Sequence, residues 1–208
     1  MKMIPGLVAA ALLLAATPAR AEPVTLLALG DSLTAGYGLD PASAFPVKLE
    51  AALKARGHDV VVINAGVSGD TVAQGAQRLD WSLTPEVDGV IVELGANDAL
   101  RGLPVPQAEA ALATILDALA AKKLPVLLAG MLAPPNLGQD YGTAFNGMYG
   151  RLAGPRGALL YPFFLDGVAG QAALNQADGL HPTAEGVDVI VQKMLPKVED
   201  LLDRIGPK

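Results

Sequence analysis

Residues 24–36, VTLLALGDSLTAG, decide the fold, because an apolar run of strand length ends here in a glycine and leads directly into a serine. Gly30 and Gly36 flank this serine and permit a tight turn, so the hydroxyl of Ser32 can be presented at the end of the strand. The alternative interpretation is that Asp31 or Ser32 only caps a short helix, and this segment taken by itself favours it.

Four more apolar runs follow, separated by longer stretches with helical periodicity. Each run is continuously apolar rather than alternating, which indicates strands that are covered on both faces, as in a parallel sheet. The predicted fold is a three-layer α/β/α sandwich with right-handed crossovers, in which ligands bind at the carboxyl ends of the strands. The five predicted strands are Val24–Leu29, Val60–Ile63, Gly89–Leu94, Pro125–Ala129 and Leu159–Phe164.

Three helices are predicted with most detail. The first spans Phe45–Arg56 and stops at Gly57. The second spans Pro106–Lys122, with the proline in its first turn. The third spans Thr183–Leu202, where Pro196 is expected to kink or interrupt it.

Length and composition narrow the class of protein. A chain of 208 residues that is 51% hydrophobic can bury one core without a disulfide or a metal. The absence of cysteine excludes a thiol nucleophile, a thiolate zinc site and a redox CxxC motif. With only His58 and His181, a histidine-rich metal site is also disfavoured, and we expect no metal.

The amino terminus is typical of a signal peptide. Lys2 is followed by an apolar stretch, Leu7–Ala16, and by the small-x-small sequence Ala19-Arg20-Ala21. Cleavage after Ala21 is predicted, which leaves a single domain of residues 22–208 in the periplasm or outside the cell. An uncleaved membrane anchor is the alternative, although the stretch is shorter than the ~20 residues of a spanning helix.

The charge of the chain disfavours two classes of partner. Loss of Lys2 and Arg20 with the signal peptide lowers the formal net charge from −6 by two, to −8. This sign opposes binding to nucleic acid or to anionic membranes, and no Lys/Arg-rich run offsets it. We therefore expect a small neutral substrate and, from size and composition, a monomer.

A second glycine-rich segment, residues 64–71 (NAGVSGDT), follows the second predicted strand. Its glycines can direct backbone N–H groups into a cleft, which suits a developing oxyanion. The alternative is a simple strand-to-helix turn capped by Asp70 or Thr71. A G-x-S-x-G nucleophile elbow around Ser68 is excluded because position 70 is aspartate.

Two more polar segments lie at predicted strand or helix ends. Gly95-Ala96-Asn97-Asp98 could aim a side-chain amide into the same cleft, or make only an Asx turn. Asp178-Gly179-Leu180-His181-Pro182 spaces a carboxylate and an imidazole so that a turn lets Asp178 hold one nitrogen of His181. By itself an Asp-x-x-His pattern also fits a surface turn.

Together the four segments resemble the sequence blocks of the SGNH (GDSL) hydrolases, over Leu26 to Gly186. Longer runs such as LGDSLTAGYGL and VELGANDALRG are most similar to the periplasmic thioesterase/arylesterase/lysophospholipase branch. The resemblance implies a five-stranded parallel sheet in flavodoxin-like order, hydrolysis of carboxylic esters or thioesters, and no metal or organic cofactor. The matching blocks are Gly30-Asp31-Ser32-Leu33, Gly69, Gly95-x-Asn97-Asp98 and Asp178-x-x-His181.

The resemblance also implies roles for these residues. Ser32 is the nucleophile, His181 the general base, and Asp178 the acid that orients the imidazole. The oxyanion hole consists of the N–H groups of Ser32 and Gly69 and the amide of Asn97.

Two other carboxyl groups stay outside this assignment. Asp31 is interpreted as structural, orienting the turn through backbone hydrogen bonds. Glu93 lies in a predicted buried strand, where nothing in the sequence indicates what satisfies its charge.

The substrate-binding walls are expected in two loops. Ala99–Pro104 matches a segment that is a mobile loop contacting the acyl chain in this branch, and Leu132–Tyr141 forms the other wall. Their leucines and prolines suit an apolar acyl group. The candidate substrate-binding residues are Ala99, Leu100, Leu103, Pro134 and Pro135.

Three alternative functions are less consistent with the sequence. An acetyl esterase acting on acetylated sugars would use the same catalytic residues, but aromatic residues are only 4% of the chain and the single tryptophan, Trp81, falls in or at the end of a predicted helix. A non-catalytic binding module is disfavoured because all triad and oxyanion positions are present. A nucleotide-binding flavodoxin-like protein lacks support, since no phosphate-binding glycine motif follows any strand.

Overall fold

The computed structural model describes residues 22–206, so the predicted signal peptide lies outside the described residues. Five strands form one parallel sheet in the order β2-β1-β3-β4-β5, which confirms the predicted flavodoxin-like order. The strands are β1 (Val24–Gly30), β2 (Val60–Gly66), β3 (Gly89–Glu93), β4 (Val126–Ala129) and β5 (Leu159–Tyr161).

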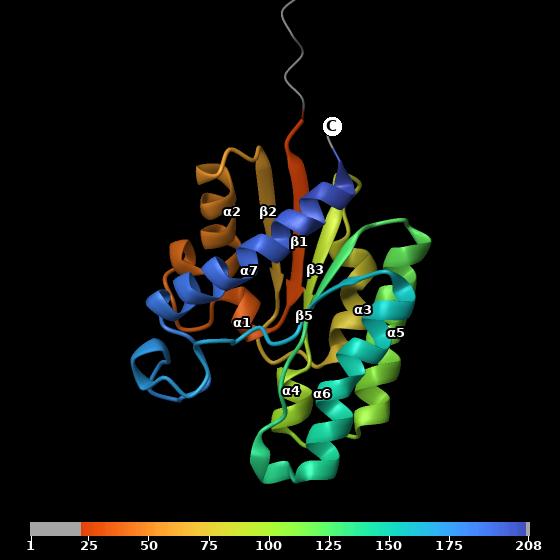
Figure 1. The fold of residues 1–208 in the computed structure, drawn as a ribbon, viewed down its shortest axis with the longest axis vertical. Helices are drawn as coiled ribbons and strands as arrows, with labels where there is room; N and C mark the ends of the chain where they lie inside the picture. Colours follow the sequence, from red (N-terminus) through yellow and green to blue (C-terminus); the bar gives the residue numbers. More distant parts are fainter. Residues whose placement is uncertain (1–21, 207–208) are drawn as a thin grey trace, which may run out of the picture.

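Helices cover both faces of the sheet (Figure 1). One layer contains α2 (Phe45–Ala55) packed against α7 (Ala184–Ile205), and the other contains α3 (Val72–Ser82), α5 (Val105–Ala121) and α6 (Gln139–Ala153). The short helices are α1 (Ser32–Ala35) and α4 (Ala96–Leu100), and the 3-10 turns are Pro41–Ser43, Pro135–Leu137, Gly154–Arg156 and Ala172–Leu174.

The core explains why the strands read as unbroken apolar runs. Every residue of β3 and β4 is buried, and so is β1 from Thr25 to Gly30. Side chains on both faces of these central strands are covered by helices, so no position in them requires a polar residue. On α7 the apolar residues that face the sheet are buried, among them Val187, Ile190, Val191, Met194 and Leu195.

Helices α7 and α6 differ from what the sequence led us to expect. Helix α7 is continuous through Pro196 to Ile205, so the proline does not interrupt it. Helix α6 was not predicted, because its glycines at 142, 147 and 150 weaken the intrinsic preference for a helix. Its buried residues Phe145, Met148 and Tyr149 show that packing against the core overrides this preference.

The parallel arrangement brings the loops after all five strands to one edge of the sheet. The order of the sheet reverses between β1 and β3, which is where α/β folds of this kind bind ligands. At the same edge of the sheet, the end of β2 approaches α1 very closely: a Cβ on Gly66 would lie 2.3 Å from the backbone nitrogen of Ala35. Glycine at position 66 is therefore required for the nucleophile turn to pack against the sheet.

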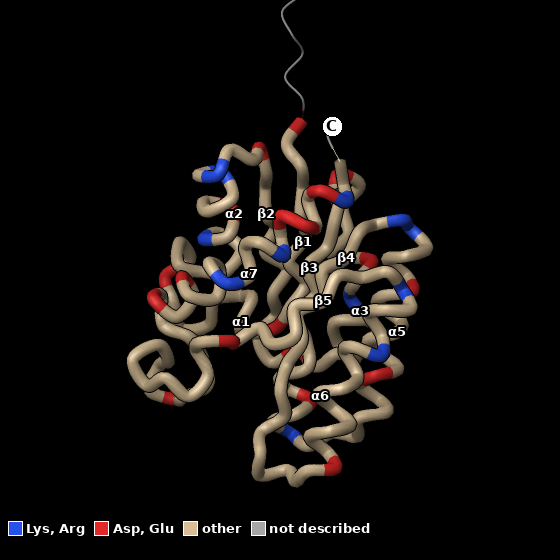
Figure 2. The backbone as a smooth tube through the Cα atoms, viewed as in Figure 1, with Lys and Arg blue, Asp and Glu red and all other residues tan. Residues whose placement is uncertain are grey.

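Charges are interspersed over the surface rather than gathered on one element (Figure 2). Lys48–Asp188 at 2.6 Å and Arg56–Glu199 at 3.0 Å join the α2 segment to α7. Within residues 22–206, no helix combines the length and the apolar character that crossing a membrane requires.

Candidate active site

The nucleophile candidate, Ser32, is the first residue of α1 and is separated from the end of β1 by Asp31 alone. Asp31 caps this helix, since its Oδ1 accepts a hydrogen bond from the Leu33 N–H at 3.0 Å. The capping interpretation of this segment and the nucleophile interpretation are therefore compatible, because the cap is what fixes the turn that presents the Ser32 hydroxyl.

A continuous hydrogen-bonded chain joins Ser32 to His181 and Asp178. The Nε2 of His181 lies 3.0 Å from Ser32 Oγ, and its Nδ1 lies 2.6 Å from Asp178 Oδ2. The other carboxylate oxygen, Oδ1, accepts the N–H groups of Leu180 at 2.9 Å and His181 at 3.0 Å. Hydrogen bonds from the His181 backbone and ring, followed by that from Leu180, lower the pKa of Asp178 to about 2, so it is ionised at neutral pH.

His181 is held by residues that the motif did not include. Its carbonyl accepts the Gln176 N–H at 2.7 Å, and the ring of Tyr37 lies 4.7 Å from the imidazole, centroid to centroid. The side-chain amide of Gln176 also donates to the carbonyl of Tyr37 at 2.8 Å. The turn after the nucleophile and the turn before α7 thus support each other.

The oxyanion candidates lie on adjoining loops. The Nδ2 of Asn97 donates to the carbonyl of Asp70 at 3.1 Å and to Asp31 Oδ2 at 3.2 Å. The guanidinium of Arg101 donates to the carbonyl of Gly69 at 2.9 Å and to Asn97 Oδ1 at 3.4 Å. Arg101, which lies outside the four matching blocks, therefore joins the Gly69 loop to Asn97 through hydrogen bonds.

A pocket of about 410 Å³ opens beside this chain of hydrogen bonds, and Ser32, Asn97 and His181 are in its wall. Gly69 and Asp178 are not among the described residues that line it. Apart from His181, the described residues that line it are uncharged, among them Ala99, Leu100, Leu132, Pro134, Pro135, Phe163 and Leu180.

Leu103 is the one predicted substrate-binding residue that the structure places elsewhere. It is absent from the described lining of the pocket, and its carbonyl accepts the Tyr141 hydroxyl at 2.9 Å. The physical reason is that the chain turns at Arg101-Gly102 after α4, which directs Leu103 toward α6 instead.

Sequence comparison gives this geometry a family. The model of the GDSL-like lipase/acylhydrolase family matches residues 28–189, which include Ser32, Gly69, Asn97, Asp178 and His181. The chain belongs to this family. It is accordingly a hydrolase, and its five-stranded sheet with helices on both sides is the SGNH-hydrolase fold.

Individual relatives of this GDSL-like hydrolase are named as esterases or thioesterases. The chain is 39% identical to the esterase TesA of Pseudomonas aeruginosa, over 88% of this chain and 92% of the relative. It is 37% identical to thioesterase 1/protease 1/lysophospholipase L1 of Escherichia coli strain K12, over 86% and 85% of the two chains. A crystal structure of AlinE4, an SGNH-hydrolase family esterase, matches with 47% identity and a TM-score of 0.74, over 88% of this chain and 99% of that one.

Next to Ser32 lies a pair of fully buried carboxyl groups, Asp31 and Glu93. Thr34 Oγ1 donates to Glu93 Oε2 at 2.8 Å, and the Asp31 N–H approaches the same oxygen at 3.5 Å, while Glu93 Oε1 has no partner among the described residues. Burial, followed by the charge of Asp31, raises the pKa of Glu93 well above its usual range. This shift favours the protonated, neutral form of Glu93, which is the form that a buried strand accommodates at the lower cost.

Asp31 gives the stability of the protein a predictable pH dependence. Burial raises its pKa to about 6, although hydrogen bonds from Leu33 and Asn97 oppose this shift. Between pH 4 and 6 the folded state thus binds more protons at Asp31 than the unfolded state, so stability falls as pH rises. We expect Asp31 to lower the free energy of unfolding by about 2 kcal/mol across this window, and Asp31→Asn to flatten the slope in urea titrations.

Asp178→Asn is the matched control for this experiment. The pKa of Asp178 is lowered, so its contribution is present above the unfolded value near pH 4 and is lost only as pH falls toward 2. This variant should keep the wild-type slope between pH 4 and 6. If the dependence of stability on pH between pH 4 and 6 were unchanged in Asp31→Asn, the raised pKa of Asp31 would be contradicted.

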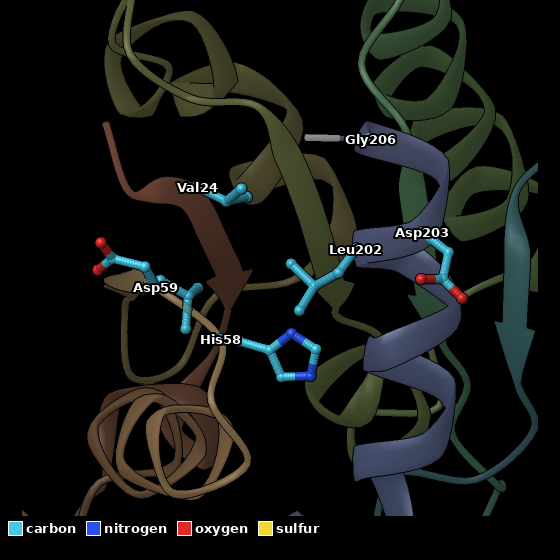
Figure 3. Close-up of a pocket in the computed structure, with 7 residues that line it drawn as sticks. Val24, His58, Asp59, Leu202, Asp203 and Gly206 are labelled. Carbon is cyan, nitrogen blue, oxygen red and sulfur yellow. The ribbon is translucent and has the colours of Figure 1, made fainter. Parts of the chain in front are cut away.

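A second cavity, of about 250 Å³, lies at the opposite, amino-terminal end of the strands (Figure 3). Val24 and Val60 begin their strands there, and Leu202 and Gly206 contribute the end of α7. His58 points toward α7 in this view, and its Nε2 lies 3.3 Å from Glu199 Oε1. His58 is therefore remote from Ser32 and has a structural partner.

Proposed function

We propose that this protein hydrolyses carboxylic esters and thioesters of apolar acyl groups through an acyl-enzyme on Ser32. The observation that carries the proposal is the unbroken series from Asp178 through His181 to Ser32 at the wall of an uncharged pocket. The names of the relatives, an esterase and a thioesterase/lysophospholipase, support the same chemistry.

In the first step His181 Nε2 accepts the proton of Ser32 as Oγ attacks the acyl carbon. Asp178 keeps the proton of the imidazole on Nδ1, which leaves Nε2 as the acceptor, and stabilises the imidazolium that forms. The protonated His181 then returns its proton to the leaving alcohol or thiol as the carbon–heteroatom bond breaks. Water, activated in the same way, hydrolyses the acyl-enzyme.

The tetrahedral oxyanion accepts hydrogen bonds from the N–H groups of Ser32 and Gly69 and from Nδ2 of Asn97. In the resting protein both Nδ2 hydrogens have acceptors, the carbonyl of Asp70 and the carboxylate of Asp31. One of these contacts is exchanged for the oxyanion as charge develops. The amide orientation is maintained during this exchange because Arg101 holds Asn97 Oδ1.

The pocket lining determines the acyl specificity in this proposal. Leu100, Leu132 and Leu180 line the pocket and remain half-exposed, so an acyl chain that covers them gains burial with each methylene. Each buried methylene contributes about 0.8 kcal/mol. Longer esters should therefore react with higher kcat/KM than acetate until the pocket is filled.

Hydrolysis of p-nitrophenyl esters from acetyl to palmitoyl in metal-free buffer tests both parts of the proposal. We expect a maximum at medium or long chains, and Leu132→Ser should lower kcat/KM for decanoate several-fold while changing acetate by less than about twofold. Activity confined to acetate would contradict the apolar-acyl assignment and favour small acetyl esters, including those of sugars. A chain inert toward the whole series would contradict ester hydrolysis itself.

We further propose that the protein is exported to the periplasm or the exterior and acts as a monomer. The first described residues start β1 at the edge opposite Ser32, so a leader preceding Glu22 would not obstruct the pocket (Figure 1). Amino-terminal sequencing of the exported protein should begin at Glu22, and retention of residues 1–21 in a membrane fraction would contradict cleavage.

A further inference from the structure

We infer that Arg78 is a positioning residue of the oxyanion site. It maintains this site by holding the Gly69–Asp70 turn against Gly30, the last residue of the strand that precedes Ser32. The inference rests on the proposed ester hydrolysis. Arg78 lies on α3, is absent from the pocket lining, and has no role in the triad.

The guanidinium of Arg78 uses all three of its nitrogens. Nε donates to Asp70 Oδ2 at 2.6 Å, Nη2 donates to the carbonyl of Gly30 at 2.8 Å, and Nη1 donates to Ser82 Oγ at 3.3 Å. The side chains of Arg78 and Asp70 are only 20% and 10% exposed. A charge-assisted bond that is this sheltered holds its geometry better than a surface pair, whose attraction water and salt screen.

Two of the three acceptors of Arg78, Asp70 and Gly30, adjoin residues of the proposed oxyanion site. Asp70 follows Gly69 directly, and its own carbonyl accepts the amide of Asn97 at 3.1 Å. Gly30 precedes the nucleophile by two residues, and its carbonyl also accepts the N–H of Val67 at 3.0 Å. One side chain thus fixes the spacing between the elements that carry the three oxyanion donors.

The chemistry of this clamp requires arginine. Its planar fork reaches a carboxylate and a carbonyl in fixed directions, whereas a lysine ammonium is a single point charge on a flexible stem. Loss of the fork would let the Gly69–Asp70 turn move relative to Ser32. A displacement of about 1 Å in a positioned group can lower a rate by roughly 100-fold.

A purely stabilising role predicts different kinetics. In that case an Arg78 variant would melt at a lower temperature, but each folded molecule would keep the wild-type kcat. A positioning role predicts a lower kcat per active site with little change in KM, because the interaction affected is formed mainly in the transition state.

The test compares Arg78→Met and Arg78→Lys with Arg156→Met. Arg156 is a matched control, since its Nε donates to Asp117 Oδ1 at the same 2.6 Å and its Nη1 donates to the carbonyl of Leu152, away from the pocket. Hydrolysis of p-nitrophenyl butyrate is measured well below each melting temperature and normalised to folded protein. We expect kcat to fall about 10- to 100-fold in Arg78→Met, less in Arg78→Lys, and less than twofold in Arg156→Met, with KM within about twofold throughout.

The Asn97→Ala background provides the second measurement. Because the turn that Arg78 holds also orients Asn97 through the Asp70 carbonyl, Arg78→Met should lower kcat by a clearly smaller factor in this background than in the wild type. Should Arg78→Met fail to fold, Asp70→Asn, which removes the ionic partner and keeps the shape, is measured in its place.

Additive effects in the double variant, or a lowered melting temperature with unchanged kcat, would overturn the inference while leaving ester hydrolysis intact. Wild-type protein inactive on all esters would instead overturn the proposed function.

Discussion

Replacing Ser32 by alanine should lower kcat/KM on p-nitrophenyl esters by at least about 10⁴-fold. The variant removes the atom that attacks the acyl carbon, while Nε2 of His181, 3.0 Å from it in the wild type, can at best activate water. Ester binding should persist, because the uncharged wall of the pocket is unchanged. The measurement is the initial rate across the ester series at equal concentrations of folded protein.

Ser68→Ala is the matched control for this variant. Ser68 lies exposed in the glycine-rich segment after β2, close in sequence to Gly69, but takes no part in the hydrogen-bonded chain to His181. We expect it to keep activity within a few-fold of the wild type. A fully active Ser32→Ala, or an inactive Ser68→Ala, would show that the nucleophile is misassigned.

Removal of the Asn97 amide is expected to have the second-largest effect, a fall in kcat of about 10² or more with KM little changed. The reason is that Nδ2 stabilises charge that exists only in the transition state, at a cost of about 3 kcal/mol when it is lost. Asn97→Ala also leaves Asp31 Oδ2 and the carbonyl of Asp70 without this donor, so its thermal stability must be measured alongside its kinetics.

Asn136→Ala controls for the loss of an amide near the site. Asn136 is exposed and adjoins the pocket wall at Pro135 without lining the pocket. Its replacement should alter kcat by less than about twofold. Equal kcat in Asn97→Ala and the wild type would contradict the oxyanion assignment while leaving the nucleophile assignment open to its own test.

The strands were predictable because burial on both faces imposes a simple pattern. Continuous apolar runs such as Leu26–Leu29 admit few other interpretations when helix-like stretches separate them. Helix α6 shows the opposite case, since its glycines carry no local helical signal and its order depends on contacts of Phe145 and Tyr149 with the core. The expected end of β5 at Phe164 was too late, because Pro162 cannot donate to a ladder and the strand stops at Tyr161.

The reacting groups were recognisable because each lies in a short motif, as with Asp178 and His181 three residues apart. Their supports were not: Arg78 lies in no motif, and Tyr37 and Arg101 lie in the runs LGDSLTAGYGL and VELGANDALRG without any sign of the contacts that they make. The groups that these three side chains contact lie in segments distant in the sequence, such as Gly30 for Arg78 and His181 for Tyr37. The alternative interpretation, that Asp70 or Thr71 caps the following helix, is confirmed through Thr71, which forms the capping box, while the carboxylate of Asp70 binds Arg78.

The most direct test of the account is mass spectrometry of the protein after reaction with an ethyl p-nitrophenyl phosphonate, which traps an activated serine. Attack by Ser32 Oγ on phosphorus with loss of p-nitrophenolate should leave one phosphonyl group per chain, and fragmentation should place it on Ser32 rather than Ser43, in step with loss of esterase activity. A label on any other residue, or ester hydrolysis that persists in protein fully labelled at Ser32, would contradict the central claim.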